Sequence, residues 1–165
     1  MPKRLNKKSV LSYTPSSSLT DLVNLRILTE LQHNPRLTMT ELGRRVGLSS
    51  PAVTERVRRL EETGVIQGYR LEINPAALGL LVAAYVRIRP NPGQLPKIAE
   101  LAQHILEVVE CHRVTGEDCF VLKVYLPSLD QLDRILDSFL VYGTTTTSLI
   151  QSSPVPLRSL PLPED

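Results

Sequence analysis

Two capped helix starts, eleven residues apart, limit the fold of this chain more than any other feature of its sequence. Thr38-Met39-Thr40-Glu41 is a capping box, in which a hydroxyl and a carboxylate bond to the free N–H groups of a helix start. Gly47 can take the left-handed backbone that ends a helix, and Ser49 can cap the next helix, with Pro51 in its first turn. Two helices joined by a short turn that contains glycine are the pattern of a helix-turn-helix.

Apolar side chains at helical spacing supply a shared core for these two helices. They are Leu42, Val46, Leu48, Val53, Val57 and Leu60. An earlier helix, from Thr20 to before Pro35, adds an apolar stripe, and Gly43 leaves room for the helices to cross closely. After Gly64, residues 65–66 and 69–73 are predicted to be short extended segments, which would make a winged variant of the motif.

The outer side of the helix that follows Ser49 is rich in arginine. Such a helix can lie in the major groove, where arginines neutralise phosphates and contact base edges. The alternative is a solvent-exposed face held by ion pairs, because Glu55 and Arg59, and also Arg58 and Glu62, are four residues apart. The candidate DNA-binding residues are Arg44, Ser49, Ser50, Pro51, Ala52, Thr54, Glu55, Arg56, Arg58, Arg59 and Arg70.

The net charge of +2 conceals a division between two halves of the chain. Residues 1–75 hold 12 Lys and Arg against 7 Asp and Glu, whereas residues 76–165 hold 7 against 10. Four of the basic residues lie in residues 1–18, which we expect to be a disordered arm that either reaches into a groove of DNA or is a solvated tail. The division indicates that the first half meets a polyanion.

The second half follows the order strand, helix, strand, strand, helix, strand. The predicted segments are 81–88, 96–107, 108–114, 119–126, a helix opened by a capping box at Ser128 and ended by Gly143, and 144–151. This βαββαβ order indicates a ferredoxin-like sheet with both helices on one face, and hence an α+β protein. The expected divisions are a basic arm (1–18), a winged helix-turn-helix domain (19–75), a ferredoxin-like domain (76–153) and a proline-rich tail (154–165).

The run from Leu42 to Tyr69 resembles the DNA-binding domain of the Lrp/AsnC, or feast/famine, transcriptional regulators. The second half, with Val114-Thr115-Gly116 in its hairpin, resembles their amino-acid-sensing (RAM-type) domain. The resemblance implies a homodimer formed through the sheets, often assembled into tetramers or octamers. It also implies that an amino acid or related effector binds between dimers and that the protein controls transcription from double-stranded DNA.

Two departures from the family pattern concern the first helix and the sensing hairpin. The family favours a pair of acidic residues at the start of the first helix, where this chain has Asp21 and Asn24. Many members have Gly-Asp-Tyr-Asp after the Val-Thr pair, where this chain has Gly-Glu-Asp-Cys from residue 116. The candidate effector-binding residues are Gly116, Glu117, Asp118, Thr145, Thr146 and Thr147, although a run of threonines also simply favours a strand.

The sequence gives only weak signals for a metal site, a cofactor or an enzyme activity. Cys111, His112 and Cys119 have poor spacing for a zinc site, so we expect no metal and buried cysteines that act as small apolar side chains. We expect no cofactor and no catalytic residues. The absence of a signal peptide and of an apolar stretch of ~20 residues predicts a cytoplasmic protein without a membrane span. The alternatives are an enzyme on the same fold, of the haem-pathway decarboxylase type, and a module that only builds oligomers.

Overall fold

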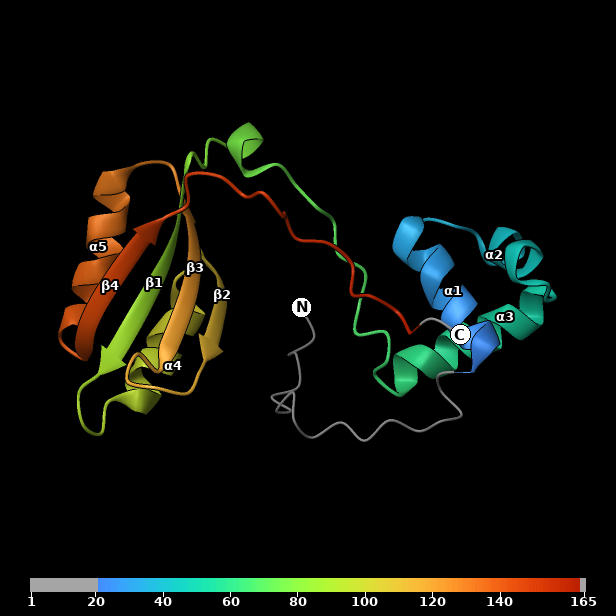
Figure 1. The fold of residues 1–165 in the computed structure, drawn as a ribbon, viewed down its shortest axis with the longest axis horizontal. Helices are drawn as coiled ribbons and strands as arrows, with labels where there is room; N and C mark the ends of the chain where they lie inside the picture. The colour runs from blue at the N-terminus through green and yellow to red at the C-terminus, as the bar shows by residue number, and fades with distance from the viewer. Residues whose placement is uncertain (1–20, 164–165) are drawn as a thin grey trace. The chain divides into compact units, whose positions relative to one another are not determined.

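The computed structural model describes residues 21–163, so the predicted basic arm lies outside the described residues. The described chain forms two compact units, residues 21–71 with 157–163 and residues 72–156. The first unit contains α1 (Leu22–His33), α2 (Met39–Val46) and α3 (Ser50–Glu62). The second contains η3 (Pro75–Leu78), β1 (Val82–Pro90), α4 (Leu95–His104), β2 (Val108–Arg113), β3 (Phe120–Leu126), α5 (Leu129–Leu140) and β4 (Gly143–Leu149), as Figure 1 shows.

The helix-turn-helix is confirmed, and its caps lie at the predicted positions. The hydroxyl of Thr38 accepts a hydrogen bond from the backbone N–H of Glu41 (3.2 Å), and the hydroxyl of Ser49 accepts one from Ala52 (3.4 Å). Gly47 ends α2 in the left-handed conformation, with φ of 73°. A methyl group added at Gly43 would lie 2.7 Å from the carbonyl oxygen of Leu48, so the turn requires glycine at that position.

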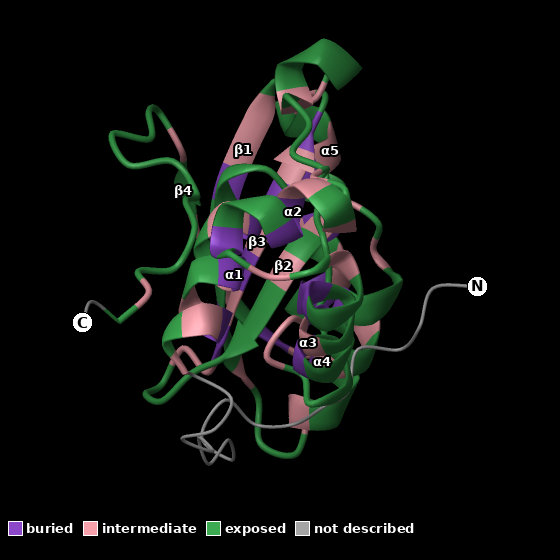
Figure 2. Ribbon diagram, turned by 90° about the vertical axis from the view of Figure 1, so that its right-hand side faces the viewer, coloured by how far each residue is buried: buried purple, intermediate pink, exposed green. Residues whose placement is uncertain are grey.

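The first unit has its own apolar core. The buried side chains are Ile27 and Leu31 from α1, Leu42 and Val46 from α2, and Val53, Val57 and Leu60 from α3. Figure 2 colours buried residues purple and exposed residues green. Because Val53, Val57 and Leu60 recur at helical spacing, they fix the inner side of α3 and leave the opposite side exposed.

The expected wing strands are not formed. Val65 and Ile66 pack against the helical core, and the N–H of Ile66 donates to the carbonyl of Leu60 (3.0 Å). This removes the partner that residues 69–73 would need, and residues 67–74 have no regular secondary structure. Tyr69 instead donates its hydroxyl to the carboxylate of Glu61 (2.9 Å); burial and this carboxylate raise the pKa of Tyr69 to about 12.

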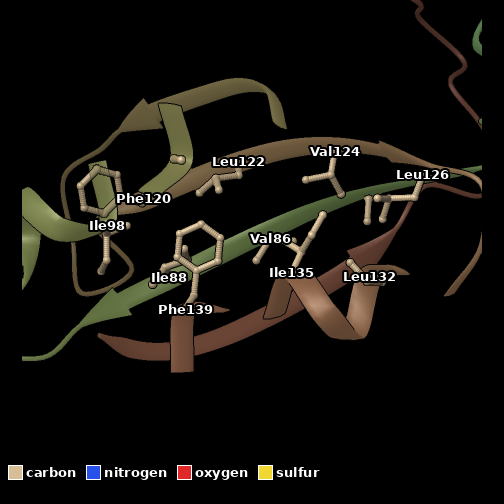
Figure 3. Packing of buried hydrophobic residues seen from close by; sticks show 12 residues of the cluster. Val86, Ile88, Ile98, Phe120, Leu122, Val124, Leu126, Leu132, Ile135 and Phe139 are labelled. Carbon is tan, nitrogen blue, oxygen red and sulfur yellow. The ribbon is translucent and has the colours of Figure 1, made fainter. Parts of the chain in front are cut away.

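The second unit has the predicted βαββαβ order and an antiparallel sheet with the strand order β2-β3-β1-β4. α4 and α5 cover the same face: Ile98, Ile135 and Phe139 share a core with alternate residues of β1 and β3. Figure 3 shows Phe139 and Ile135 directed from α5 toward Val86 and Ile88 on β1. The other face of the sheet is left without a covering layer within this unit.

The predicted ends of the second unit's helices need three corrections. α4 ends at His104 rather than near residue 107. Ser128 is the N-cap of α5, but its side chain makes no capping hydrogen bond. α5 ends at Leu140, and Gly143 begins β4 instead of ending the helix. Glycine is needed there because an added Cβ would lie 2.3 Å from the carbonyl oxygen of Arg89. Among residues 21–163, no helix is long and apolar enough to cross a membrane.

Candidate DNA interface and effector site

The exposed side of α3 and the turn before it carry most of the candidate DNA-binding residues. The exposed ones are Arg44, Ser49, Pro51, Ala52, Thr54, Glu55, Arg58, Arg59 and, in the segment after α3, Arg70; Ser50 is half-buried. Ser49 uses its hydroxyl to cap α3, and Thr54 donates its hydroxyl to the carbonyl of Ser50 (2.7 Å). The structure therefore presents small polar side chains at the start of α3 and arginines further along it.

Arg58 is held between two carboxylates on α3. Its guanidinium lies 2.6 Å from the Glu55 carboxylate and also forms an ion pair with Glu62. The pKa of Glu55 is lowered by the hydrogen bond from Arg58, and the pKa of Arg58 is raised by the same contacts. All three side chains are more than half exposed, so these pairs contribute little stability and phosphate oxygens can replace the carboxylates. The predicted pairing of Glu55 with Arg59 is replaced by Glu55 with Arg58.

Two arginines of α2 share the carboxylate of Glu41. Arg44 and Arg45 lie 2.8 and 3.1 Å from it, and their hydrogen bonds lower the pKa of Glu41 to about 2. Arg45 also reaches Glu30 on α1 at 2.9 Å, which ties α1 to α2. The side chain of Arg44 is 76% exposed, so Arg44 is the more accessible of the two cations.

Arg56 lies in a different place from the other candidate arginines. Its guanidinium turns toward the start of α1, where Nη1 donates to Asp21 Oδ2 (2.8 Å) and to Asn24 Oδ1 (3.0 Å). Asp21 in turn caps α1 through the N–H of Asn24 (2.7 Å), and Asn24 is buried. The hydrogen bonds from Arg56 and Asn24 lower the pKa of Asp21. Arg56 therefore joins α3 to α1, away from the exposed side of α3 that carries the other candidate arginines.

The sensing hairpin is tied to β1 by an arginine that the sequence did not single out. Arg89 lies 2.7 Å from the Glu117 carboxylate and 3.3 Å from that of Asp118. Gly116 has φ of 107°, which favours glycine, and Cys119 donates its thiol to the Gly116 carbonyl (3.2 Å). Only the alternation of arginines with apolar residues in β1 marked Arg89 in the sequence, and that pattern does not indicate the hairpin.

The three candidate threonines do not share one side of the sheet. Thr145 and Thr147 are half-buried and pair with Ile88 and Val86, so they lie on the helix-covered face. Thr146 is exposed and pairs with Arg87 on the open face. Successive residues of a strand point to opposite faces, so a run of adjacent threonines cannot line one surface. Thr144 pairs with Arg89 and lies on the same open face as Thr146.

The structure corrects the expectation that both cysteines are buried. Cys111 is exposed rather than buried, whereas Cys119 is half-buried against the core of the second unit. Within residues 21–163, no three His, Cys, Asp or Glu side chains are grouped so that they could hold a metal ion.

Two families match consecutive parts of the chain. Residues 20–67 match winged helix-turn-helix DNA-binding domains, and residues 83–160 match the Lrp/AsnC ligand-binding domain. The uncharacterised HTH-type transcriptional regulator YezC of Bacillus subtilis is 41% identical over 133 residues, which cover 81% of this chain and 94% of that protein. The leucine-responsive regulatory protein of Escherichia coli is 38% identical over 125 residues, which cover 73% of this chain and 76% of that protein.

A solved structure is similar over most of the chain. The feast or famine regulatory protein of Mycobacterium tuberculosis, complexed with L-methionine, is 37% identical and has a TM-score of 0.80. The similarity covers 87% of this chain and 99% of that one.

Proposed function

Because the chain belongs to the Lrp/AsnC family of transcriptional regulators, we propose that α3 is its DNA-recognition helix and that its β-rich unit senses an amino acid or related effector. The protein is a DNA-binding transcriptional regulator and not an enzyme. Its relatives are named as regulators, and none of these findings supports the haem-pathway decarboxylase alternative.

The exposed side of α3 is the observation that carries the proposed DNA contacts. The start of a recognition helix contacts base edges, and the proposal assigns this role to Ser50, Ala52 and Thr54. Arg58 and Arg59, two turns further along, would bind phosphates or base edges, and Arg44 on α2 would bind the backbone. On DNA, phosphate oxygens would take the place of Glu55 and Glu62 beside Arg58.

Replacing Arg58 with alanine tests this assignment. If Arg58 binds one phosphate, the slope of log affinity against log salt should fall by about 0.9, with little change in sequence preference. If it contacts a base, one position of the selected site should lose its preference. The measurement is binding over a salt series to DNA selected from a random pool. Arg134→Ala, an exposed arginine of α5, is the matched control. An affinity and slope equal to those of the unsubstituted protein would remove Arg58 from the interface.

The proposed effector is an amino acid. One similar regulator is named for its response to leucine, and another is complexed with L-methionine. In this chain the proposed site lies at the hairpin, with Gly116, Glu117, Asp118 and the exposed Thr146. Titration calorimetry of the full-length protein against the twenty common amino acids tests the proposal. Heat of binding from at least one of them is expected, and no heat from any would refute it.

The proposed partner of the open sheet face is a second copy of the chain. That face carries Tyr85, Val121, Lys123 and Tyr125, and the Lys123 ammonium lies 5.9 and 5.5 Å from the centres of the two tyrosine rings. These aromatic contacts engage the charge of Lys123 and leave a surface suited to packing against an identical sheet.

The mass of the assembled protein can be measured by light scattering as the protein elutes from a size-exclusion column. Tyr85→Lys should shift it toward the monomer, because it places a second ammonium group opposite Lys123 on a face that assembly would bury. An unchanged mass would exclude this face as the interface, and the same measurement distinguishes dimers from tetramers or octamers.

A symmetric dimer should select pseudo-palindromic sites with half-sites about 10 bp apart or a multiple of this. The proposed location is the cytoplasm, where cell fractionation should find the protein.

A further inference from the structure

Glu55 places a negative charge at the centre of the surface that is proposed to bind DNA. It lies midway between Val53 and Val57, which are both buried in the core of the helical unit. An α-helix turns about 100° for each residue, so a side chain two residues from each of these valines points roughly opposite to the core. The side chain of Glu55 is 63% exposed, and Ala52 and Thr54 lie within one turn of it. An acid at this position repels phosphates, so it opposes DNA binding unless it meets a hydrogen-bond donor.

In the absence of DNA that donor is Arg58. Its Nε and Nη2 donate to the two carboxylate oxygens of Glu55 at 2.9 and 2.6 Å. The hydrogen bonding from Arg58 lowers the pKa of Glu55, so the acid is ionised at neutral pH. Arg58 also forms an ion pair with Glu62. When phosphate oxygens replace the two carboxylates beside Arg58, both acids lose their cation.

The positions of the two acids on α3 decide which of them needs a new partner from DNA. Glu62 is the last residue of α3, two turns beyond Glu55. The base contacts of a recognition helix come from its N-terminal part, so Glu55 is the carboxylate that enters the major groove. A carboxylate that loses its donor and its water there is costly, and only a donor on a base edge can offset that cost.

The major groove offers one base that suits a carboxylate. Cytosine presents its N4 amino group as a donor. Thymine presents an acceptor and a methyl group, guanine presents two acceptors, and adenine places the N7 acceptor beside its N6 amino group. Acceptors repel a carboxylate, so cytosine is the base edge that fits.

We propose that Glu55 reads a cytosine through its N4 amino group, and the proposal rests on the DNA-binding function proposed above. Arg58 neutralises Glu55 while the protein is free, and it turns to phosphate when α3 enters the groove. Opposite any other base Glu55 stays without a donor. It therefore gives specificity mainly by weakening binding to the wrong sequences.

Selection of DNA from a random pool by the full-length protein tests the proposal. The unsubstituted protein should select cytosine at one position of each half-site, and replacing that C·G pair with T·A should weaken its binding about tenfold. Glu55→Gln should select adenine at the same position, because a glutamine amide matches the N6 and N7 groups of adenine. Glu55→Ala should show little preference there.

Glu62→Gln is the matched control, because Glu62 also pairs with Arg58. Glu55→Gln and Glu62→Gln should both bind random-sequence DNA more tightly, since each removes a negative charge, but Glu62→Gln should select the same site as the unsubstituted protein. The double variant Arg58→Ala, Glu55→Gln separates base reading from the positioning of Arg58. It should still select adenine where Arg58→Ala alone selects cytosine.

Three results would overturn the proposal. Selection of the unsubstituted protein's site by Glu55→Gln and Glu55→Ala would show that Glu55 reads no base, while DNA binding would stand. A change of preference that disappears when Arg58 is absent would show that Glu55 only positions Arg58. If the unsubstituted protein selects no sequence from the pool, the proposed DNA-recognition role of α3 falls together with this proposal.

Discussion

Replacing Arg56 with methionine should destabilise the helical unit and leave its DNA contacts intact. Methionine keeps an unbranched apolar stem and removes the guanidinium that joins α3 to α1. The lost contacts are a hydrogen bond of 2.8 Å to the carboxylate of Asp21 and one of 3.0 Å to the side-chain oxygen of Asn24. Because Arg56 is the residue of α3 that turns away from the proposed interface, its removal separates stability from DNA binding.

The size of the effect follows from the exposure of each partner. The side chains of Arg56 and Asp21 are 37% and 41% exposed, so their ion pair is worth at most about 1 kcal/mol. Asn24 is 6% exposed, and loss of a hydrogen bond at a buried acceptor costs roughly 1–3 kcal/mol. A combined loss of about 1–4 kcal/mol should lower the melting temperature of this unit by roughly 4–8 °C for each kcal/mol.

The assay is thermal unfolding followed by circular dichroism at 222 nm, together with DNA binding over a salt series. Arg59→Met is the matched control, because Arg59 lies on the same helix and is exposed. It should change stability by less than about 0.5 kcal/mol and lower the salt slope by about 0.9. The reasoning is refuted if Arg56→Met leaves the melting temperature unchanged and lowers the salt slope instead.

Three further predictions concern the same unit. Gly43→Ala should be destabilising in denaturant melts, because a Cβ placed 2.7 Å from the Leu48 carbonyl costs about 1–3 kcal/mol, more than the ~1 kcal/mol that alanine gains in a helix; a more stable variant would contradict this. Glu62→Gln should strengthen DNA binding about two- to fivefold at low salt, since it removes a carboxylate that competes for Arg58, and weaker binding would argue against Arg58 at the interface. The pKa of Asp21 is lowered in the folded protein, so its stabilisation is complete above about pH 4 and is lost as the pH falls through the folded value. Acid titrations of stability should therefore be flatter below pH 4 in Asp21→Asn, and identical curves would exclude this role.

The sequence predicted the elements whose signals are local. Thr38 and Ser49 cap helices by bonding to an N–H three residues ahead, and Gly47 ends a helix through its own backbone freedom. These interactions depend on neighbouring residues, so the pattern alone locates the helix-turn-helix. In β1 and β3 alternate side chains are buried, because a strand turns successive side chains to opposite faces.

The wing strands are not formed, and the three candidate threonines do not share one face, for different physical reasons. Strand formation after Gly64 depends on a cross-strand partner, and Val65 and Ile66 pack against the helical core instead. Thr145 and Thr147 lie on one face of the sheet and Thr146 on the other, because adjacent strand residues point to opposite faces.

The sequence by itself determined the two folds, their order and the surface on which the arginines of α3 lie. Only the tertiary structure decided the contacts of charged side chains whose partners lie far away in the sequence. Arg56 meets Asp21 across 35 residues, and Arg89 meets Asp118 across 29 residues. The sequence around a charged residue does not indicate a partner so far away, since the pairing arises from how helices and strands pack. That packing assigns Arg56 to holding α1 and α3 together and brings Arg89 to the sensing hairpin.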